Sequence, residues 1–307
     1  MGYKFSSKLK IIVFLLFVFT TTSCFATNDE HTGILSIEQL QSRGQIYHDN
    51  FVVNAIPKCG THLIMRCIYL MINKRVEETS DYVQEKDFTP KKAQKYLYFL
   101  RSKKGLPGIH KTHVPYFPQM AYTILKAGMK SIFFIRDPRD ALVSLVFYMD
   151  IKSGNHRDFM HIDSAVYDTL SFDEKIKALM TGSCCTNYIE TFLKPFIKWT
   201  TYKYNLSAKF EDLIGPSGGG TREKQLQVIE QIASYLNITL STEEKLAIAE
   251  HTNTYKTPKI QESMGKSYVQ GQIGNWKSFL NAENKQLFKD LFGKQLIKLG
   301  YEKDNNW

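Results

Sequence analysis

Short apolar runs and segments with a helical period alternate along most of this chain. The first apolar run, residues 51–56, reads Phe-Val-Val-Asn-Ala-Ile and stops at Pro57. A nearly continuous apolar run that is bounded by a turn residue predicts a buried strand. In the next segment, 62–73, apolar residues recur at intervals of three and four, which predicts a helix. The folded part of the chain is therefore expected to begin with a strand, a tight loop and a helix.

The same alternation continues towards the C-terminus. Further strands are predicted at 108–113, 131–135 and 207–210. Further helices are predicted at 90–104, 118–128, 138–149, 172–180, 185–199, 222–236, 242–251 and 282–298. The polar segments 150–164 and 253–275 are expected to be irregular. Strands that alternate with helices predict a single three-layer α/β domain with a central, mostly parallel sheet.

The first 26 residues have the order of a secretory signal. Basic residues precede the apolar run Ile11–Phe19, and small residues follow it up to Ala26. We expect cleavage after Ala26 and export of the chain, to a periplasm, a secretory lumen or the medium. Membrane attachment, through an uncleaved anchor or a lipid at Cys24, stays open as an alternative. Residues 27–49 are polar and are expected to link this segment to a domain over 50–307.

Charge and cysteine content narrow the choice of partners. The chain has 307 residues, enough for one large domain, and 40 basic against 30 acidic residues give a formal charge of +10. This balance favours anionic partners such as nucleotides, membrane surfaces or sulfated glycans. Because no dense run of Lys and Arg is present, nucleic acid is not expected. Five scattered cysteines fit neither a disulfide scaffold nor a zinc site, so no metal is expected.

The loop 57–62, which reads Pro-Lys-Cys-Gly-Thr-His, is a candidate anion site. A strand that ends in a glycine-containing loop and opens a helix points several backbone N–H groups in one direction. Lys58 adds a point charge, and Thr61 adds a hydroxyl donor. The loop lacks the Gly-x-x-x-x-Gly-Lys pattern of nucleoside triphosphatases. An ordinary strand-to-helix turn with a solvated lysine stays open as the alternative.

Polar residues also follow two later strands. Arg136 comes directly after the strand 131–135, and Ser144 lies eight residues further on, in the expected helix. The two side chains could hold one phosphate, although Arg136 could instead pair with Asp140. His113 ends the strand 108–113 and could act as a general base, with a purely structural histidine as the alternative.

Taken in order, these motifs resemble those of the sulfotransferases that use 3′-phosphoadenosine 5′-phosphosulfate (PAPS). The family's Pro-Lys-Ser-Gly-Thr-Thr loop is similar to 57–62, and its Lys-Thr-His-Leu-Pro segment is similar to 111–115. Its Arg and Ser, eight residues apart, match Arg136 and Ser144. Two further segments of this chain resemble the family's Tyr-Glu-Asp-Leu and Gly-Asp-Trp-Lys, namely 210–213 and 274–277. The resemblance runs from about residue 50 to residue 301.

The resemblance implies a PAPS-dependent sulfotransferase with a P-loop-like phosphosulfate-binding loop, which moves a sulfonate group to an acceptor hydroxyl or amine. It implies that His113 is the catalytic base and that Lys58 and Lys111 assist the transfer. It assigns donor binding to Lys58, Cys59, Gly60, Thr61, His62, Arg136 and Ser144. The sequence does not identify the acceptor. Four aromatic residues could line its pocket or belong to the core: Tyr116, Phe117, Phe147 and Tyr148.

Several positions depart from the family pattern. Cys59 and His62 replace Ser and Thr, and Leu63 replaces a Trp that stacks on the adenine in many relatives. At 269–270, Val-Gln replaces an Arg-Lys pair that grips the 3′-phosphate. A sulfotransferase-like binding protein without catalysis and another P-loop-like transferase are therefore the alternatives. Cys59, at a helix start, is expected either to have a lowered pKa or simply to fill the loop.

Overall fold

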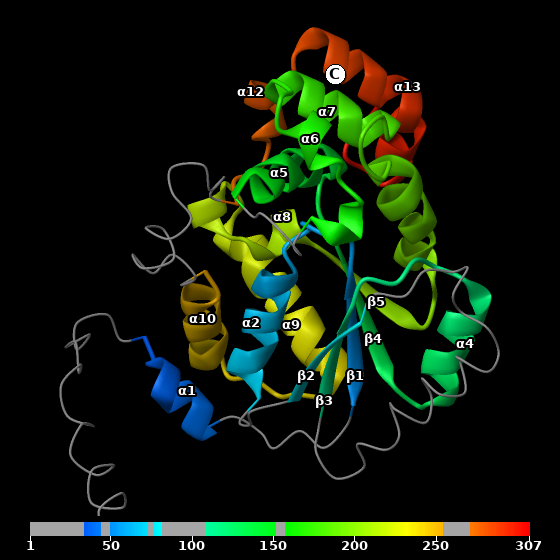
Figure 1. Ribbon diagram of the computed structural model, residues 1–307. Coiled ribbons are helices and arrows are strands. Elements are labelled where there is room, and N and C mark those ends of the chain that lie inside the picture. The colour runs from blue at the N-terminus through cyan, green and yellow to red at the C-terminus, as the bar shows by residue number, and fades with distance from the viewer. Residues whose placement is uncertain (1–33, 44–49, 73–76, 82–107, 152–156, 254–270) are drawn as a thin grey trace, which may run out of the picture.

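The computed structural model describes residues 34–43, 50–72, 77–81, 108–151, 157–253 and 271–307. The expected signal at 1–26 and the expected helix at 90–104 lie outside these ranges and stay predictions. Within the described ranges, no helix combines the length and the apolar character needed to cross a membrane. The coloured part of Figure 1 is one sheet with helices around it.

Five parallel strands form the sheet, in the order β2-β3-β1-β4-β5. They are β1 (Phe51–Ala55), β2 (Glu77–Asp81), β3 (Gly108–Thr112), β4 (Lys130–Ile135) and β5 (Asn205–Lys209). The predicted parallel character of the sheet is thereby confirmed. The sequence does not predict β2, because Glu-Glu-Thr-Ser-Asp has none of the apolar residues that mark β1 and β4.

The segments with candidate chemistry leave the sheet at one edge. β1 lies between β3 and β4, with Val53 beside Lys111 in the register. Because all these strands run the same way, the segments that follow β1, β3 and β4 emerge together (Figure 1). The topology therefore gathers the loop 57–62, His113 and Arg136 at the carboxyl end of the sheet.

Side chains on the two faces of β1 pack into two separate hydrophobic cores. Phe51, Val53 and Ala55 face one core, while Val52 and Ile56, just beyond the strand, face the other. The first core is covered by α1 (Ile37–Arg43), α2 (Thr61–Met71), α8 (Phe210–Leu213), α9 (Arg222–Leu236) and α10 (Thr242–His251). The second is covered by α4 (Pro118–Lys126), α5 (Pro138–Ile151), α6 (Ser164–Tyr167), α7 (Phe172–Thr181), α12 (Trp276–Phe279) and α13 (Ala282–Lys298). Helices on both faces confirm the three-layer α/β fold.

Three of the longer helices begin where a capping side chain lies. Thr221, Ser241 and Asn281 each accept a hydrogen bond from the backbone N–H three residues further on, at the starts of α9, α10 and α13. Such a cap satisfies an N–H group that has no partner within the helix. The bounds of these three helices agree with those predicted from the sequence.

The expected linker at 27–49 contains a helix that belongs to the folded part. Within it, α1 places Leu40 in the core, and Leu35, just before the helix, is buried as well. Ile37 packs against the same core, and the apolar positions 34, 35, 37 and 40 are a helical signal within the otherwise polar segment. The folded part therefore begins before residue 50.

Three other expected segments differ in detail. The helix expected at 185–199 is a π-helical turn, η4 (Ile189–Leu193), followed by a 3-10 helix, η5 (Lys194–Thr201). Pro195 lies at the start of η5, and a proline has no N–H to continue an α-helical ladder. The expected loop at 150–164 contains a short 3-10 helix, η3 (Asp158–Met160). The strand expected at 207–210 begins earlier, and Phe210 starts α8.

Candidate active site

The loop after β1 has the geometry of an anion-binding turn. Lys58 and Gly60 both have positive φ, 70° and 90°, so the backbone bends sharply before α2 begins at Thr61. The Cys59 N–H donates a hydrogen bond to the Ile56 carbonyl at 3.1 Å, which closes the turn. The first N–H groups of a helix have no carbonyl partner within it, so the start of α2 offers donors to an anion.

Gly60 is required at its position for two reasons. Its φ of 90° is one that side chains rarely adopt, and a Cβ there would lie 2.5 Å from Cδ2 of Phe210. The Phe210 ring also lies against Arg136, whose guanidinium carbon is 4.4 Å from the ring centroid. One aromatic ring thus packs against both the loop and the candidate phosphate-binding arginine.

Two tyrosines hold the loop from the side of the second core. The Nζ of Lys58 is 3.8 Å from the centroid of the Tyr148 ring on α5, a cation–π contact. The buried Tyr188 hydroxyl donates a hydrogen bond to the Pro57 carbonyl at 2.7 Å. Both contacts fix the part of the loop from which the lysine projects.

Cys59 does not have the reactive character that its place in the loop suggests. It is fully buried, and burial raises the pKa of its thiol to about 12. The expectation of a lowered pKa is therefore wrong, because lost hydration outweighs the nearby Arg136. Cys59 fits the alternative, a small residue that fills the loop. His62, in the first turn of α2, is exposed.

His113 has the tautomer that a general base needs. Its Nδ1 lies 2.7 Å from the Ala55 carbonyl oxygen. Because a carbonyl can only accept, Nδ1 carries the hydrogen and Nε2 keeps its lone pair. Burial lowers the pKa of His113, and the charges of Lys111, His62 and Lys58 lower it further. The imidazole is therefore neutral at neutral pH.

Asn54, inside β1, holds the chain on both sides of His113. Its Oδ1 accepts hydrogen bonds from the Thr112 hydroxyl at 3.1 Å and from the Val114 N–H at 2.9 Å. Its Nδ2 donates to the Val114 carbonyl at 2.9 Å. Asn54 is not among the site residues predicted from the sequence, although an amide in the middle of an apolar run is a signal that could have found it.

Arg136 is buried directly after β4. Its Nη2 donates to the Gln272 carbonyl at 3.0 Å and lies 3.9 Å from Oδ2 of Asp140. The expected alternative pairing with Asp140 is therefore present. The Nε of Arg136 is buried and has no acceptor within the part of the chain that the structure describes.

Asp140 ties the segment after residue 270 to α5. Its two carboxylate oxygens accept the N–H groups of Gly274 at 2.8 Å and Trp276 at 2.9 Å. Burial raises the pKa of Asp140, while Arg136 opposes that rise. Trp276 itself packs on the guanidinium of Arg139, 3.8 Å from the ring centroid. Asp140 thus holds the motif at 274–277 close to Arg136.

Most of the aromatic residues proposed for an acceptor pocket belong to the core. Phe117 is buried. Tyr116 packs edge-on against Trp199, with ring centroids 5.1 Å apart, and Phe147 packs in an aromatic cluster with residues of α7 and α12. Tyr148, which contacts Lys58, is the one of the four that lies against the loop.

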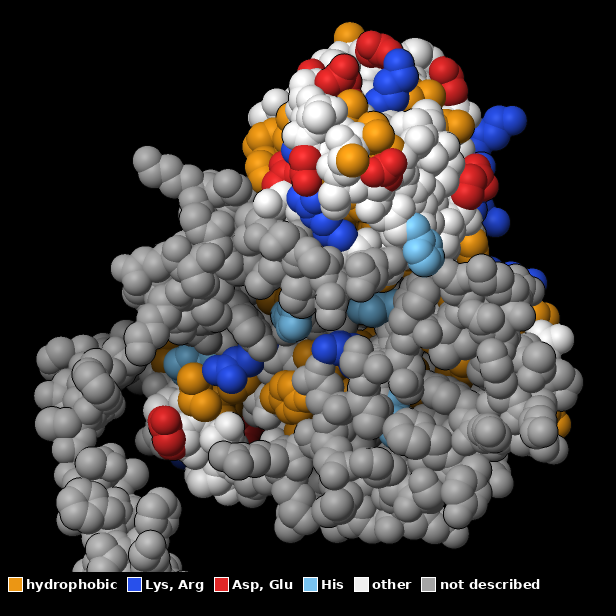
Figure 2. Space-filling model, viewed as in Figure 1, with side chains coloured by type: hydrophobic (Ala, Val, Ile, Leu, Met, Phe, Trp, Pro, Cys, Tyr) orange, Lys and Arg blue, Asp and Glu red, His pale blue; other side chains and the backbone are white. Residues whose placement is uncertain are grey.

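The structure brings most of the predicted site residues to one edge of the sheet. The loop 57–62, Lys111, His113 and Arg136 lie there, and Figure 2 shows histidine and basic side chains among apolar ones in this region. Ser144 lies half-buried on α5 and makes no hydrogen bond to Arg136 within the part of the chain that the structure describes. Residues 269–270 lie outside the described ranges. The roles of all these residues stay predictions.

Sequence comparison finds relatives of one kind. A family model described as "Sulfotransferase domain" matches residues 48–300. Sulfotransferase 6B1 of Pan troglodytes is 28% identical over 275 residues, which cover 83% of this chain and 80% of that protein. Sulfotransferase 6B1 of Homo sapiens is 27% identical with the same coverage.

A solved structure has the same fold. The mouse sulfotransferase SULT7A1, complexed with PAP, gives a TM-score of 0.55 at 15% identity. The match covers 85% of this chain and 88% of that chain. The parallel sheet with helices on both faces is thus an arrangement also seen in a sulfotransferase structure.

Proposed function

Because the chain belongs to the sulfotransferase family, we propose that it transfers a sulfonate group from PAPS to an acceptor hydroxyl or amine. The observation that carries this proposal is the contact of His113 Nδ1 with the Ala55 carbonyl at 2.7 Å. This hydrogen bond leaves the Nε2 of His113 free to accept a proton, at the same edge of the sheet as the loop 57–62. The mouse relative, solved in complex with PAP, supports PAPS as the donor.

The proposed transfer makes one bond to sulfur and breaks another. The acceptor atom bonds to the sulfur of PAPS while the bond between sulfur and the bridging phosphate oxygen breaks. Nε2 of His113 takes the proton of the acceptor, and the bridging oxygen keeps the electron pair. Lys58 supplies the positive charge that stabilises this oxygen, as in phosphoryl transfer. Lys111 helps to hold the sulfonate.

The 3′-phosphate of the donor is assigned to the region of Arg136. The buried Nε of Arg136 has no acceptor within the described residues, and a phosphate oxygen satisfies such a donor. Ser144 adds a hydroxyl from α5. The loop 57–62 and the start of α2 receive the 5′-phosphosulfate through their backbone N–H groups.

One observation favours a second function, a sulfotransferase-like binding protein without turnover. At 269–270 the chain has Val-Gln, and neither side chain carries a charge for the 3′-phosphate. In addition, the Nη2 of Arg136 already donates a hydrogen bond to the Gln272 carbonyl. Binding and turnover therefore have to be measured separately.

The test is a calorimetric titration of the chain with PAP, beside ATP and AMP. We expect binding that requires the 3′-phosphate and weakens at least about tenfold in Arg136→Ala. Arg222→Ala is the control, because it removes an arginine on α9 whose partner is Glu250. Absence of PAP binding, or a preference for ATP, contradicts the proposed donor. PAP binding without transfer to any phenol, alcohol or amine tested supports the second function.

A further inference from the structure

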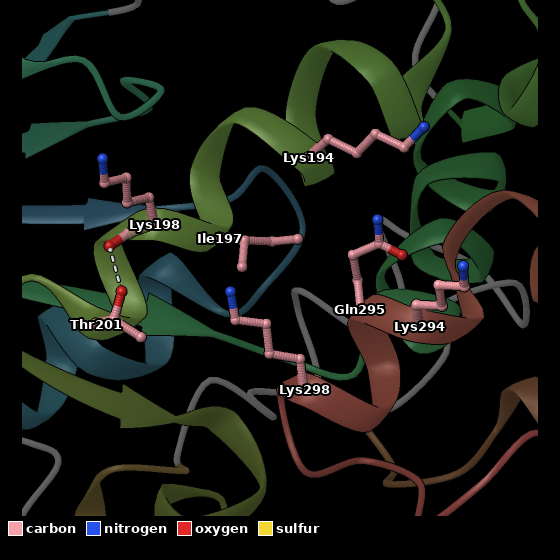
Figure 3. Close-up of a pocket in the computed structure, with 7 residues that line it drawn as sticks. All are labelled: Lys194, Ile197, Lys198, Thr201, Lys294, Gln295 and Lys298. Carbon is pink, nitrogen blue, oxygen red and sulfur yellow. Dashed lines mark hydrogen bonds between the residues drawn. The ribbon is translucent and has the colours of Figure 1, made fainter.

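A groove lined by lysines lies between η5 and α13, and it shares no residue with the predicted catalytic site. Its volume is about 510 Å³. We call it the lysine groove; η5 contributes Lys194, Ile197, Lys198 and Thr201, and α13 contributes Lys294, Gln295 and Lys298. Figure 3 shows these side chains on two facing helices.

The lysine groove has a strong excess of positive charge. Four of its seven lining residues are lysines, and none is acidic. The Nζ of Lys194 lies 2.5 Å from a carboxylate oxygen of Glu190, a residue that does not line the groove. The Nζ of Lys198 lies 4.9 Å from the centroid of the Tyr116 ring. Within the described residues, Lys294 and Lys298 have no carboxylate partner. Ammonium groups that face one groove repel each other, and an anionic ligand relieves that repulsion.

The neutral residues of the lining suit a sugar. Thr201 and Gln295 offer hydroxyl and amide groups, and the Ile197 side chain lies between the walls (Figure 3). Extended peptides are recognised through the backbone of a sheet edge or through apolar anchor pockets. Both walls here are helical, so their backbone groups are engaged within the helices, and the lining has a single apolar side chain. These features favour a carbohydrate over an acidic peptide.

We propose that the lysine groove binds a sulfated oligosaccharide. Lysine ammonium groups act as point charges, whereas the planar fork of arginine matches carboxylate and phosphate groups in pairs. The lining contains lysine and no arginine. Lys294 and Lys298 are four residues apart on α13, so they lie on one face of that helix. Sulfate groups along one short chain can therefore contact both walls. The inference does not depend on the proposed transfer reaction.

The test measures binding of a dextran sulfate oligosaccharide to the full chain by surface plasmon resonance, without PAPS. We expect Lys294→Ala/Lys298→Ala to weaken binding about tenfold, because each exposed ion pair contributes modestly. The matched control is Lys224→Ala/Lys245→Ala, which removes the same charge from α9 and α10. That control should bind within about twofold of the wild type. Lys198→Ala, on the opposite wall, should weaken binding about threefold.

Three outcomes would overturn the inference. Equal losses in the two double variants would show that only the net charge of the chain attracts the polyanion. If unsulfated dextran bound as tightly as dextran sulfate, the sulfate groups would not be what the groove recognises. Equal or tighter binding of poly-glutamate would assign the groove to an acidic peptide instead. Far-ultraviolet circular dichroism of each variant checks that these exposed substitutions leave the fold intact.

Discussion

His113 is the single residue whose chemistry the structure specifies most closely. We predict that His113→Ala lowers turnover with PAPS at least about 100-fold, the low end for loss of a general base, and leaves PAP affinity unchanged. The control is His251→Ala, because the Nε2 of His251 also lies against a backbone carbonyl, that of Leu35 at 2.8 Å. Turnover of His113→Ala within about threefold of the wild type would remove this residue from catalysis.

The pH profile gives a second measurement on the same residue. Burial lowers the pKa of His113 below its ordinary value of 6.5. Protonation removes the lone pair of Nε2, so activity should be lost only where the pH falls below 6.5. We therefore expect the acid limb of kcat/KM to lie below pH 6.5. An acid limb at a higher pH would show that another group is the base.

Gly60 provides a prediction about the loop. Gly60→Ala combines a positive φ with a Cβ only 2.5 Å from the Phe210 ring. We expect it to lower the free energy of unfolding by about 2–4 kcal/mol and to abolish PAP binding. Gly128→Ala is the control, since Gly128 has a φ of 69° but no atom within 4 Å of the added Cβ. It should cost only the backbone strain, about 1 kcal/mol. Thermal melts compare the two, and equal losses would contradict the steric argument.

The sequence could locate these residues but not their contacts. The sequence predicts that the loop 57–62, His113 and Arg136 follow strands of one sheet, and the resemblance to the sulfotransferases implies that they form one site. The burial of Cys59 could not be predicted, because the surrounding side chains come from distant segments. For the same reason, the contact between Lys58 and Tyr148 has no sequence signal.

At the scale of elements, the Asn54 side chain on β1 adds hydrogen bonds to the backbone pairing of β1 with β3. Asn54→Ala leaves the Thr112 hydroxyl and the Val114 N–H without their acceptor. We expect a loss of about 1–3 kcal/mol in the free energy of unfolding, as for other buried donors left unpaired. Turnover should fall as well, because both donors flank His113.

Urea unfolding and PAPS turnover check this prediction together. The control is Asn205→Ala. Asn205 lies in the edge strand β5 and donates a hydrogen bond to the Trp199 carbonyl of η5, so its loss should affect stability only. Unchanged turnover in Asn54→Ala, despite lost stability, would show that Asn54 does not position the base.

Local signals explain which elements the sequence could predict. The helices α9, α10 and α13 have N-cap side chains, and their bounds were predicted correctly. The polar strand β2 pairs with β3 at the sheet edge, a long-range contact that its own sequence does not signal. The irregular helix at 189–201 depends on Pro195 and on packing against the second core.

At the scale of the whole molecule, the C-terminal segment closes back on the sheet. Glu302 pairs with Arg139 at 2.5 Å, and Trp307 packs on the same guanidinium, 4.3 Å from the ring centroid. The Tyr301 hydroxyl donates a hydrogen bond to Oε2 of Glu211 at 3.2 Å. The end of the chain is therefore bound to the same sheet edge that carries the predicted donor site.

Glu211 makes this closure sensitive to pH. Its Oε1 accepts the Asp137 N–H at 2.7 Å, and burial raises the pKa of its carboxyl from 4.5 to about 7. Between these pH values the folded state binds more protons than the unfolded state, so stability falls as pH rises from 4.5 to about 7. The total contribution is about 3 kcal/mol. Glu211→Gln should therefore remove a decline that the wild type shows in urea unfolding between pH 4.5 and about 7. Identical pH slopes in the two proteins would mean that another group controls the decline.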